Sequence, residues 1–306
     1  MTLFIAEIGN NHNGSLERAK RLVLKCKEIG VNIVKFQLRD FNKLYRTTEN
    51  DVEDLGVEYV KDILRKYELN TSEHFELFKF CLEHEIEYMC SPWDESSVSF
   101  LESLGVRRYK IASADFDNLP LIETLIKTNK QLIFSTGMAS LREIETRVKW
   151  LESKYVDFAL LHCNSTYPAP FEDIQLEFLK NLSELAPNVG YSGHERGIAV
   201  SLAAVTLGAK IVERHITEDK NLEGPDHQAS LLPDEFYKLI EMSKEIKKAY
   251  GNETILDRTL SQGTLLNKEN LGKSIVAAHD LEVGTFLTEE VLEIRSPGQG
   301  ISPSKM

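Results

Sequence analysis

Two lysines and two histidines are the residues best suited to chemistry, and each lies in or just after a short apolar run. Lys35 and Lys110 lie near the ends of two such runs, and His194 and His215 end two others. Lysine ammonium groups beside hydroxyl side chains suit a phosphate or carboxylate ligand, which they bind through charge-assisted hydrogen bonds. Two histidines with carboxylates nearby suit a divalent metal that keeps open coordination positions. These residue types predict an anion site beside a metal site, without naming a reaction.

Other polar residues end the same apolar runs. Carboxylates, amides and hydroxyls recur there, as expected if the runs converge on one active site: Glu7, Gln37, Ser91, Ser113, Asp115, Ser135, Thr136, Asn164, Ser165, Ser192 and Glu213. Glu213 precedes His215 by two residues, which places both side chains on the same face of a strand. A carboxylate and an imidazole are therefore predicted to point into the same site.

Each of these residues also has a simpler interpretation. A single strand lysine such as Lys35 is more often a solvated charge at the rim of a protein, and a histidine that ends a strand is more often structural. Ser135 and Thr136, which precede Gly137, could cap the next helix, and Glu213 could serve only to orient a neighbour. Their joint occurrence at successive run ends favours a functional site over these separate explanations.

The elements that must position these residues alternate regularly along the chain. Short runs rich in Ile, Val, Leu, Phe and Tyr are each followed by a segment with helical spacing; the runs are 3–9, 32–37, 87–93, 107–113, 131–137, 158–164, 188–194 and 210–216. Eight such units in about 250 residues predict an α/β fold, the (β/α)8 TIM barrel, with its active site at the carboxyl ends of the strands. The alternative is a doubly wound open sheet. It would usually carry a glycine-rich turn after its first strand, and this sequence has none there.

Two segments interrupt this regularity. The connection from Leu38 to Asn70 is much longer than an ordinary loop between a strand and a helix, and residues 57–69 within it predict an inserted helix. Long connections of this kind are usually lids or binding loops. Beyond Gly251 the pattern changes to short strands and turns. We therefore expect a barrel over residues 1–255, a linker over 256–270 and a small separate segment over 271–306.

Composition limits the classes of function. The chain has 306 residues, of which 42% are hydrophobic, enough for one large core and a small appendage. Its 48 acidic and 36 basic residues give a net charge of −12, which argues against nucleic acid as a partner but not against a small anionic substrate.

No apolar run approaches the roughly 18 residues that a membrane span needs. Four scattered cysteines and a strand-like beginning without a basic leader predict reduced thiols in a cytoplasmic protein.

The motifs at the run ends resemble those of one known family. Seven stretches occur in the order typical of the N-acetylneuraminate (sialic acid) synthase family: FIAEIGNNHNGS, VKFQ, YKIASAD, FSTGM, LLHCNSTYPAPFED, GYSGHERGIAVSLAAVTLGA and IVERHITEDKNLEGPDH. The resemblance covers essentially the whole chain. The last part of the chain resembles the beginning of the antifreeze-like (SAF) domain that follows the barrel in this family, through the stretch LGKSIVAAHDLEVGTFLTEEVL.

The resemblance implies an enzyme that condenses phosphoenolpyruvate with an open-chain N-acylated hexosamine, N-acetylmannosamine or a relative, and releases phosphate. The implied phosphoenolpyruvate-binding residues are Lys35, Ser91, Lys110, Ser113 and Ser192, with Asn164 or Ser165 as further candidates. The implied contacts to the sugar or the reacting centre are Glu7, Gln37, Asp115, Tyr167 and Asp226. The resemblance further implies Mn2+ or Mg2+ on His194 and His215, and a catalytic set of Glu7, Lys35, Lys110, Asp115 and Glu213. It also implies a homodimer in which the tail of one subunit lies over the barrel of the other.

The sequence departs from the family pattern at four places. Asp115 stands where many relatives have a longer glutamate, and a water could fill the gap. Ser165 occupies the position aligned with the asparagine of some bacterial relatives, so Asn164 lies one place early. The turn that contains Ser296 has serine where bacterial members have an arginine that reaches into the partner's barrel. The sequence stops at Met306, partway through a complete antifreeze-like domain, so we expect a naturally short or truncated tail.

Two functions of different classes follow from this interpretation. The first is a nonulosonic acid synthase that acts on an unphosphorylated or a 6-phosphorylated hexosamine. The GPDH motif at 224–227 resembles the sialic or legionaminic branch of the family more than the pseudaminic one. The alternative is a non-catalytic sugar- or phosphate-binding barrel protein that has lost its lid. The intact pairs Lys35/Lys110 and His194/His215 favour the enzyme, because a degenerate site would be expected to lose some of them.

Overall fold

The structure of the chain is a computed structural model that describes residues 2–44, 57–251 and 259–306, with the backbone alone for residues 57–61. The chain divides into two compact units, residues 1–250 and residues 251–306.

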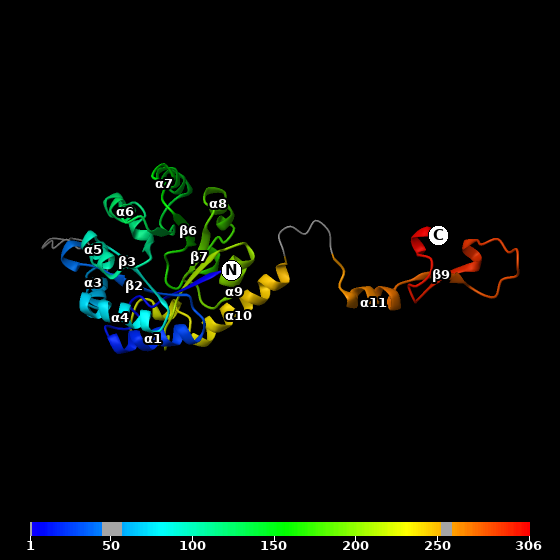
Figure 1. The fold of residues 1–306 in the computed structure, drawn as a ribbon, viewed down its shortest axis with the longest axis horizontal. Coiled ribbons are helices and arrows are strands. Elements are labelled where there is room, and N and C mark those ends of the chain that lie inside the picture. Colours follow the sequence, from blue (N-terminus) through cyan, green and yellow to red (C-terminus); the bar gives the residue numbers. More distant parts are fainter. Residues whose placement is uncertain (1, 45–56, 252–258) are drawn as a thin grey trace. The chain divides into compact units, whose positions relative to one another are not determined.

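Eight parallel strands close into a barrel in the first unit (Figure 1). Each strand pairs with the next one along the chain, and the last strand closes the ring by pairing with the first. The strands coincide closely with the predicted apolar runs: β1 (Leu3–Glu7), β2 (Ile33–Leu38), β3 (Glu87–Pro92), β4 (Arg108–Ile111), β5 (Gln131–Ser135), β6 (Phe158–Cys163), β7 (Val189–Gly193) and β8 (Ile211–His215). The predicted (β/α)8 TIM barrel is therefore confirmed.

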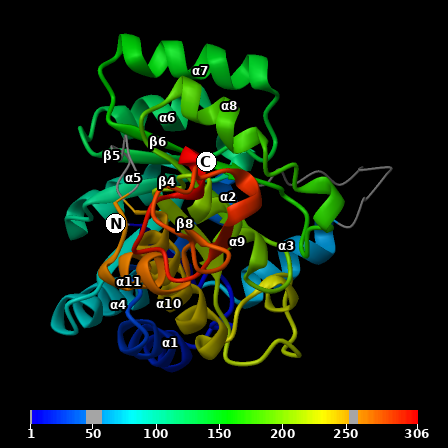
Figure 2. The same cartoon turned by 90° about the vertical axis from the view of Figure 1, so that its right-hand side faces the viewer.

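A helix follows each strand, with further helices between β2 and β3. The helices that connect successive strands and end this unit are α1 (Leu16–Glu28), α4 (Thr71–Glu83), α5 (Glu95–Leu104), α6 (Leu119–Ile126), α7 (Leu141–Ser153), α8 (Phe178–Leu185), α9 (Ala199–Thr206) and α10 (Pro233–Tyr250). Figure 2 shows α6, α7 and α8 on one side of the strands and α1, α4 and α10 on the other. Within the described residues, none of the helices is both long enough and apolar enough to cross a lipid bilayer.

Polar residues at the right spacing start several of these helices. The Ser15 side chain accepts a hydrogen bond from a backbone NH in the first turn of α1. Asn70 with Glu73 starts α4, and Ser140 with Glu143 starts α7, each pair forming a capping box in which side chains and backbone NH groups bond reciprocally. These caps satisfy NH groups that have no partner inside the helix, and they end the preceding loop at a defined residue.

The barrel interior explains why the polar residues gather at one end. A small apolar cluster fills the interior, and its strand members are Ile5, Ile33, Met89, Ile133, Ala159, Leu161 and Ile211. Side chains alternate along a strand, so the residue two places further on points into the same interior, one layer closer to the carboxyl ends. Six of these residues are followed two places later by a polar or thiol side chain: Glu7, Lys35, Ser91, Ser135, Cys163 and Glu213. The interior of the barrel thus has an apolar layer and, next to it on the side of the carboxyl strand ends, a polar layer.

The long connection after β2 contains two helices in its described parts. They are α2 (Phe41–Leu44) and α3 (Val57–Lys66), and α3 confirms the inserted helix predicted for residues 57–69. Residues 45–56 lie outside the described residues.

The second unit consists of a helix and a small sheet. The helix is α11 (Gln262–Leu271), and strands β9 (Ser274–Ala277) and β10 (Leu292–Arg295) pair antiparallel. Large apolar side chains are exposed on this unit, among them Leu271, Phe286 and Leu287. That this unit is the beginning of an antifreeze-like domain stays a prediction.

Candidate active site

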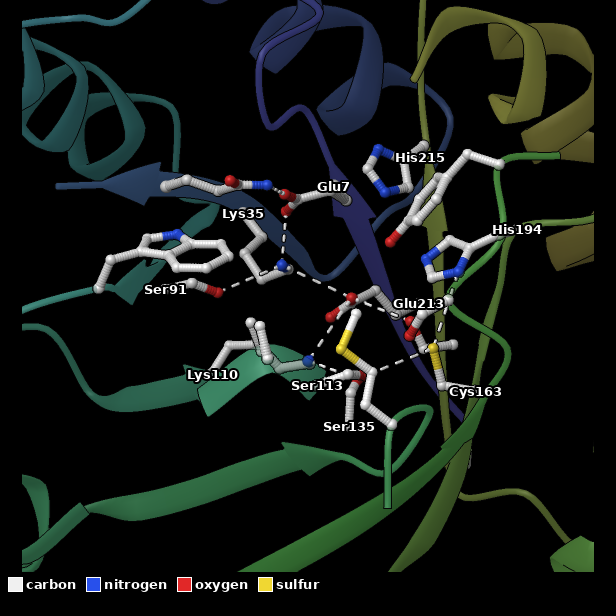
Figure 3. Close-up of a pocket in the computed structure, with 18 residues that line it drawn as sticks. Glu7, Lys35, Ser91, Lys110, Ser113, Ser135, Cys163, His194, Glu213 and His215 are labelled. Atoms are coloured by element: carbon white, nitrogen blue, oxygen red, sulfur yellow. Dashed lines mark hydrogen bonds and ion pairs between the residues drawn. The ribbon is translucent and has the colours of Figure 1, made fainter. Parts of the chain in front are cut away.

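A pocket lies at the carboxyl ends of the barrel strands (Figure 3). All eight strands contribute to it, either directly or through the residues that follow them. Its lining residues are Glu7, Lys35, Gln37, Ser91, Trp93, Lys110, Ala112, Ser113, Ala114, Ser135, Met138, Cys163, Ser165, Tyr167, Ser192, His194, Glu213 and His215. The pocket therefore occupies the place where active sites of this fold lie.

Two lysines and two glutamates form a buried charge network in this pocket. Lys35 Nζ lies 2.8 Å from Glu7 Oε2 and 3.5 Å from Glu213 Oε1. Lys110 Nζ lies 4.0 Å from Glu213 Oε1. The strand register produces this arrangement, because Glu7 pairs with Lys35 on one side and with His215 on the other. Lys35 is 4% exposed and Lys110 is 2% exposed, so the interpretation of a solvated rim charge is wrong.

The charges of the network shift one another's pKa. Burial acts to lower the pKa of Lys35, but Glu213 and Glu7 outweigh it and the pKa is raised. Burial acts to raise the pKa of Glu213, but Lys110 and Lys35 outweigh it and the pKa is lowered. Burial lowers the pKa of Lys110, and the negative charge of Glu213 offsets only part of this effect. Burial likewise raises the pKa of Glu7, against the opposing charge of Lys35. Lys35 is therefore the better compensated lysine, and Lys110 gains most from a further anion.

Hydroxyl groups lie beside both lysines. Lys110 Nζ donates a hydrogen bond of 2.6 Å to Ser135 Oγ, and Lys35 Nζ lies 3.4 Å from Ser91 Oγ. Ser192 Oγ donates to Glu213 Oε1 at 3.2 Å. Ammonium groups and hydroxyls together can surround a phosphate or carboxylate with charge-assisted hydrogen bonds.

Ser135 and Thr136 do not cap the helix that follows them. Ser140 starts α7, as described above, while the hydroxyl of Thr136 donates to the Leu161 carbonyl at 3.0 Å. Ser135 accepts from Lys110 and lines the pocket. The capping interpretation is therefore wrong. Ser113 Oγ instead accepts the backbone NH of Gly137 at 3.1 Å, which ties the turn after β5 to the turn after β4.

The two predicted metal-binding histidines lie next to each other. The ring centroids of His194 and His215 are 5.4 Å apart, and the ring of Tyr167 packs against His194 with centroids 4.0 Å apart. His194 Nδ1 donates to the carbonyl of Asn164 at 2.6 Å, which leaves Nε2 as the nitrogen with a free lone pair. Burial lowers the pKa of His194 to about 4 and that of His215 well below its usual value. Both rings are therefore neutral at neutral pH, which is the form that binds metal.

These histidines fit part of a metal site. Among the described residues, His215 Nδ1 is buried without a hydrogen-bond partner, and Asp226 Oδ2 lies 3.7 Å from it. No group of three or more His, Cys, Asp or Glu in the described part of the chain has the arrangement of a complete metal site. The donors present thus suit a divalent ion held by two imidazoles, with its other positions open to water or substrate.

Three of the fifteen residues to which the family resemblance assigns a role lie outside the pocket lining. The Asn164 side chain points into its own loop, where it donates to the Asp173 carbonyl and accepts the Thr166 NH. Asp115 lies in the short helix η1 (Ser113–Asp115) and accepts from Asn118. Asp226 precedes η3 (His227–Ala229), and its Oδ2 lies 3.7 Å from His215 Nδ1. The other twelve predicted residues all line the pocket.

Three larger residues line the pocket without having been assigned a role from the sequence. Cys163 ends β6 two places after the interior residue Leu161, so strand alternation alone could have placed it there. Trp93 directly follows β3, one place beyond Pro92. Met138 lies in the turn after β5, at the end of the FSTGM motif, so the motif could have marked it.

Comparison with known proteins identifies relatives over nearly the whole chain. The family model described as the NeuB family matches residues 22–255. An N,N'-diacetyllegionaminic acid synthase of Campylobacter jejuni is 38% identical, over 98% of this chain and 92% of its own length. The human N-acetylneuraminate-9-phosphate synthase is 36% identical, over 95% of this chain and 82% of its own length.

A solved structure agrees with these matches. The N-acetylneuraminic acid (sialic acid) synthetase of Leptospira borgpetersenii, in complex with citrate, superimposes with a TM-score of 0.79 at 31% sequence identity. The superposition covers 87% of this chain and 91% of that one. Both the sequence and the fold of the chain thus match the same group of synthases.

Proposed function

The chain belongs to the NeuB family, and on that premise we propose that it is a nonulosonic acid synthase. It condenses phosphoenolpyruvate with an open-chain N-acylated hexosamine and releases phosphate. The observation that carries this proposal is the Lys35, Glu7, Glu213 and Lys110 network beside the two imidazoles. The names of its relatives support a sugar of the sialic or legionaminic type.

The chain's residues divide the work of this reaction. Lys110, with Ser135, and Lys35, with Ser91, bind the phosphate and carboxylate of phosphoenolpyruvate and offset their charge. When C3 of phosphoenolpyruvate bonds to the aldehyde carbon, positive charge develops at C2, and the Glu7 carboxylate stabilises it.

Water then adds to C2 and loses a proton, the aldehyde oxygen gains a proton and becomes a hydroxyl, and the bond from C2 to the phosphate oxygen breaks with release of phosphate. Glu213 lies between the two lysines. It keeps both ammonium groups oriented toward the substrate while the substrate's charge changes.

His194 and His215 would hold a divalent cation, Mn2+ or Mg2+. When bound, the ion supplies a Lewis acid for the aldehyde oxygen of the sugar. The fit rests on the two neutral, adjacent imidazoles, each with one ring nitrogen free of hydrogen bonds among the described residues.

We also propose a cytoplasmic homodimer in which residues 271–306 are a partial antifreeze-like domain that covers the barrel of the partner subunit. The exposed apolar side chains of the second unit support this, because such groups are normally covered. Serine at position 296 replaces the arginine expected there, so this tail supplies no guanidinium to the sugar at that position.

A phosphate-release assay tests the proposed reaction. The purified chain is incubated with phosphoenolpyruvate and Mn2+, alone and with N-acetylmannosamine, its 6-phosphate or a 2,4-diacetamido-trideoxyhexose. We expect release of phosphate only when phosphoenolpyruvate and one of these sugars are both present. Binding of phosphoenolpyruvate without release for any sugar would instead identify a non-catalytic binding protein.

A further inference from the structure

A separate buried ion pair is formed by the two residues that neighbour His194 and His215 in the sequence. Arg214 Nη1 is 2.6 Å from Glu195 Oε1, and both side chains are fully buried. Glu195 follows His194, and Arg214 stands between Glu213 and His215. Because alternate strand residues face opposite sides, Glu213 and His215 point into the barrel and Arg214 points outward. The pair therefore lies outside the barrel wall and shares its backbone with the pocket.

Arg214 connects β8 to the segment that follows β7. Its guanidinium donates to the Gly197 carbonyl at 2.8 Å, to Ser201 Oγ at 2.9 Å and to the carbonyl of Glu195. It also donates to the Ala229 carbonyl at 3.5 Å, in the loop that carries Asp226. One side chain thus ties the segment after β7 and the loop of residues 226–229 to β8.

The second carboxylate oxygen of Glu195 is hydrogen-bonded to a residue of β7. Tyr191 Oη donates to Glu195 Oε2 at 2.7 Å, so the carboxylate is fixed between β7 and β8. The ion pair also lies close against Gly193, since a Cβ there would be 2.7 Å from Glu195 Oε2 and 3.0 Å from Arg214 Cδ. Gly193 pairs with Arg214 in the strand register, one place before His194. Any shift of the ion pair would therefore move the backbone of His194 relative to that of His215.

We infer that Glu195 and Arg214 are positioning residues, which set the separation of His194 and His215 and thereby the affinity for the divalent cation. This inference rests on the proposed metal role of the two histidines. Neither residue touches the pocket, because neither is among its lining residues. Groups that orient metal ligands from behind typically change metal affinity by about 10–100-fold when they are replaced.

The test measures metal binding directly, without turnover. Mn2+ is titrated into the apo protein, and free Mn2+ is followed by its electron paramagnetic resonance signal. We expect Glu195→Gln and Arg214→Met to raise the Mn2+ dissociation constant at least tenfold. Arg214→Lys keeps the charge and part of the hydrogen bonding, so it should lie between these variants and the parent. The dissociation constant of phosphoenolpyruvate, measured without metal, should stay within threefold of the parent.

A matched pair at the opposite end of the barrel serves as the control. Arg108 Nε on β4 lies 2.7 Å from Glu87 Oε1 on β3, so this is also an ion pair between neighbouring strands. Glu87→Gln should leave the Mn2+ dissociation constant unchanged. If Glu195→Gln is folded by circular dichroism and binds Mn2+ within twofold of the parent, the inference is overturned.

Two further variants separate the inference from the proposed function. If His194→Ala and His215→Ala bind Mn2+ as the parent does, the proposed metal site itself is wrong. If those two lose Mn2+ and Glu195→Gln does not, only the positioning role fails. Should the single variants not fold, the double variant Glu195→Gln/Arg214→Met removes both charges and leaves no unpaired one buried. Weakened Mn2+ binding in that variant supports the inference, and parent-like binding overturns it.

Discussion

The two pocket lysines differ in what holds them when no substrate is bound. Lys35 has two carboxylates within 3.5 Å, whereas Lys110 has one at 4.0 Å and a serine hydroxyl. Removing Lys35 would leave Glu7 and Glu213 as buried carboxylates with less compensation, and an uncompensated buried charge is costly. Removing Lys110 disturbs the resting network less, because Lys35 still lies between Glu7 and Glu213.

We therefore expect different outcomes from the same substitution. Lys110→Met should weaken binding of phosphoenolpyruvate by one to two orders of magnitude, because a charge-assisted hydrogen bond contributes about 1.5–3 kcal/mol and about 1.4 kcal/mol is tenfold. Its thermal unfolding temperature should stay close to that of the parent. Lys35→Met should weaken binding similarly and also lower the unfolding temperature. Calorimetric titration with phosphoenolpyruvate and thermal melts measure the two effects.

Lys210→Met is the control for both lysine variants. Lys210 lies just before β8, at the end of the strand away from the pocket, and donates to the Pro187 carbonyl. It should bind phosphoenolpyruvate like the parent. If Lys110→Met is folded and also binds like the parent, that lysine is no part of the anion site.

At the scale of elements, helix α4 is tied to strand β3 through a buried histidine. His74 Nδ1 and Tyr88 Oη are 2.7 Å apart, and both residues are buried. Burial lowers the pKa of His74 from 6.5 to about 4. The unfolded chain takes up a proton on His74 below about pH 6.5, whereas the folded chain does so only near pH 4. The contribution of this histidine to stability is thus full above pH 6.5 and falls as the pH drops through that window.

His74→Gln removes the titrating group and keeps a side chain that can hydrogen-bond to Tyr88. We expect the free energy of unfolding of the parent, relative to this variant, to fall by about 2 kcal/mol between pH 7.5 and pH 5. Urea unfolding followed by tryptophan fluorescence measures it, because both tryptophans, Trp93 and Trp150, lie in the first unit. A difference that does not change with pH would contradict the prediction, because it would show that His74 has the same pKa in the folded and the unfolded chain.

At the scale of the whole molecule, the second unit leaves large apolar side chains exposed. Phe286 is 89% exposed, Leu271 is 68% exposed and Leu287 is 67% exposed. A unit of this size rarely forms a stable core alone, and exposed apolar groups of this kind usually mark an interface. The proposed homodimer gives these side chains a covering surface.

Light scattering of the full chain at micromolar concentration should accordingly give twice the monomer mass of 34.8 kDa. In the dimer, residues 271–306 should be protected from limited proteolysis relative to a diluted, dissociated sample. A monomeric chain with a protease-sensitive tail would contradict the proposed arrangement.

The sequence alone determined the barrel and most of the pocket. Eight apolar runs, each followed by a segment with helical spacing, are enough to predict a closed parallel barrel, and in such a barrel the carboxyl ends of all strands lie at the same end. Because side chains alternate along a strand, Glu7, Lys35 and Glu213 must point into the interior like the apolar residues two places before them. This prediction does not require knowing which residues lie next to them in space. Local periodicity carries this information, and it can be read from the sequence.

Pairing between distant residues was decided only by the tertiary structure. Asn164 ends a strand as the other site residues do, yet the loop after it turns its amide away to Asp173. Lys35 rather than Lys110 takes the closest carboxylate, because the register places Glu7 beside it. Glu195 and Arg214 are 19 residues apart, and nothing in either motif marks them as partners. Such contacts depend on loop paths and side-chain directions in three dimensions, and local periodicity does not encode these.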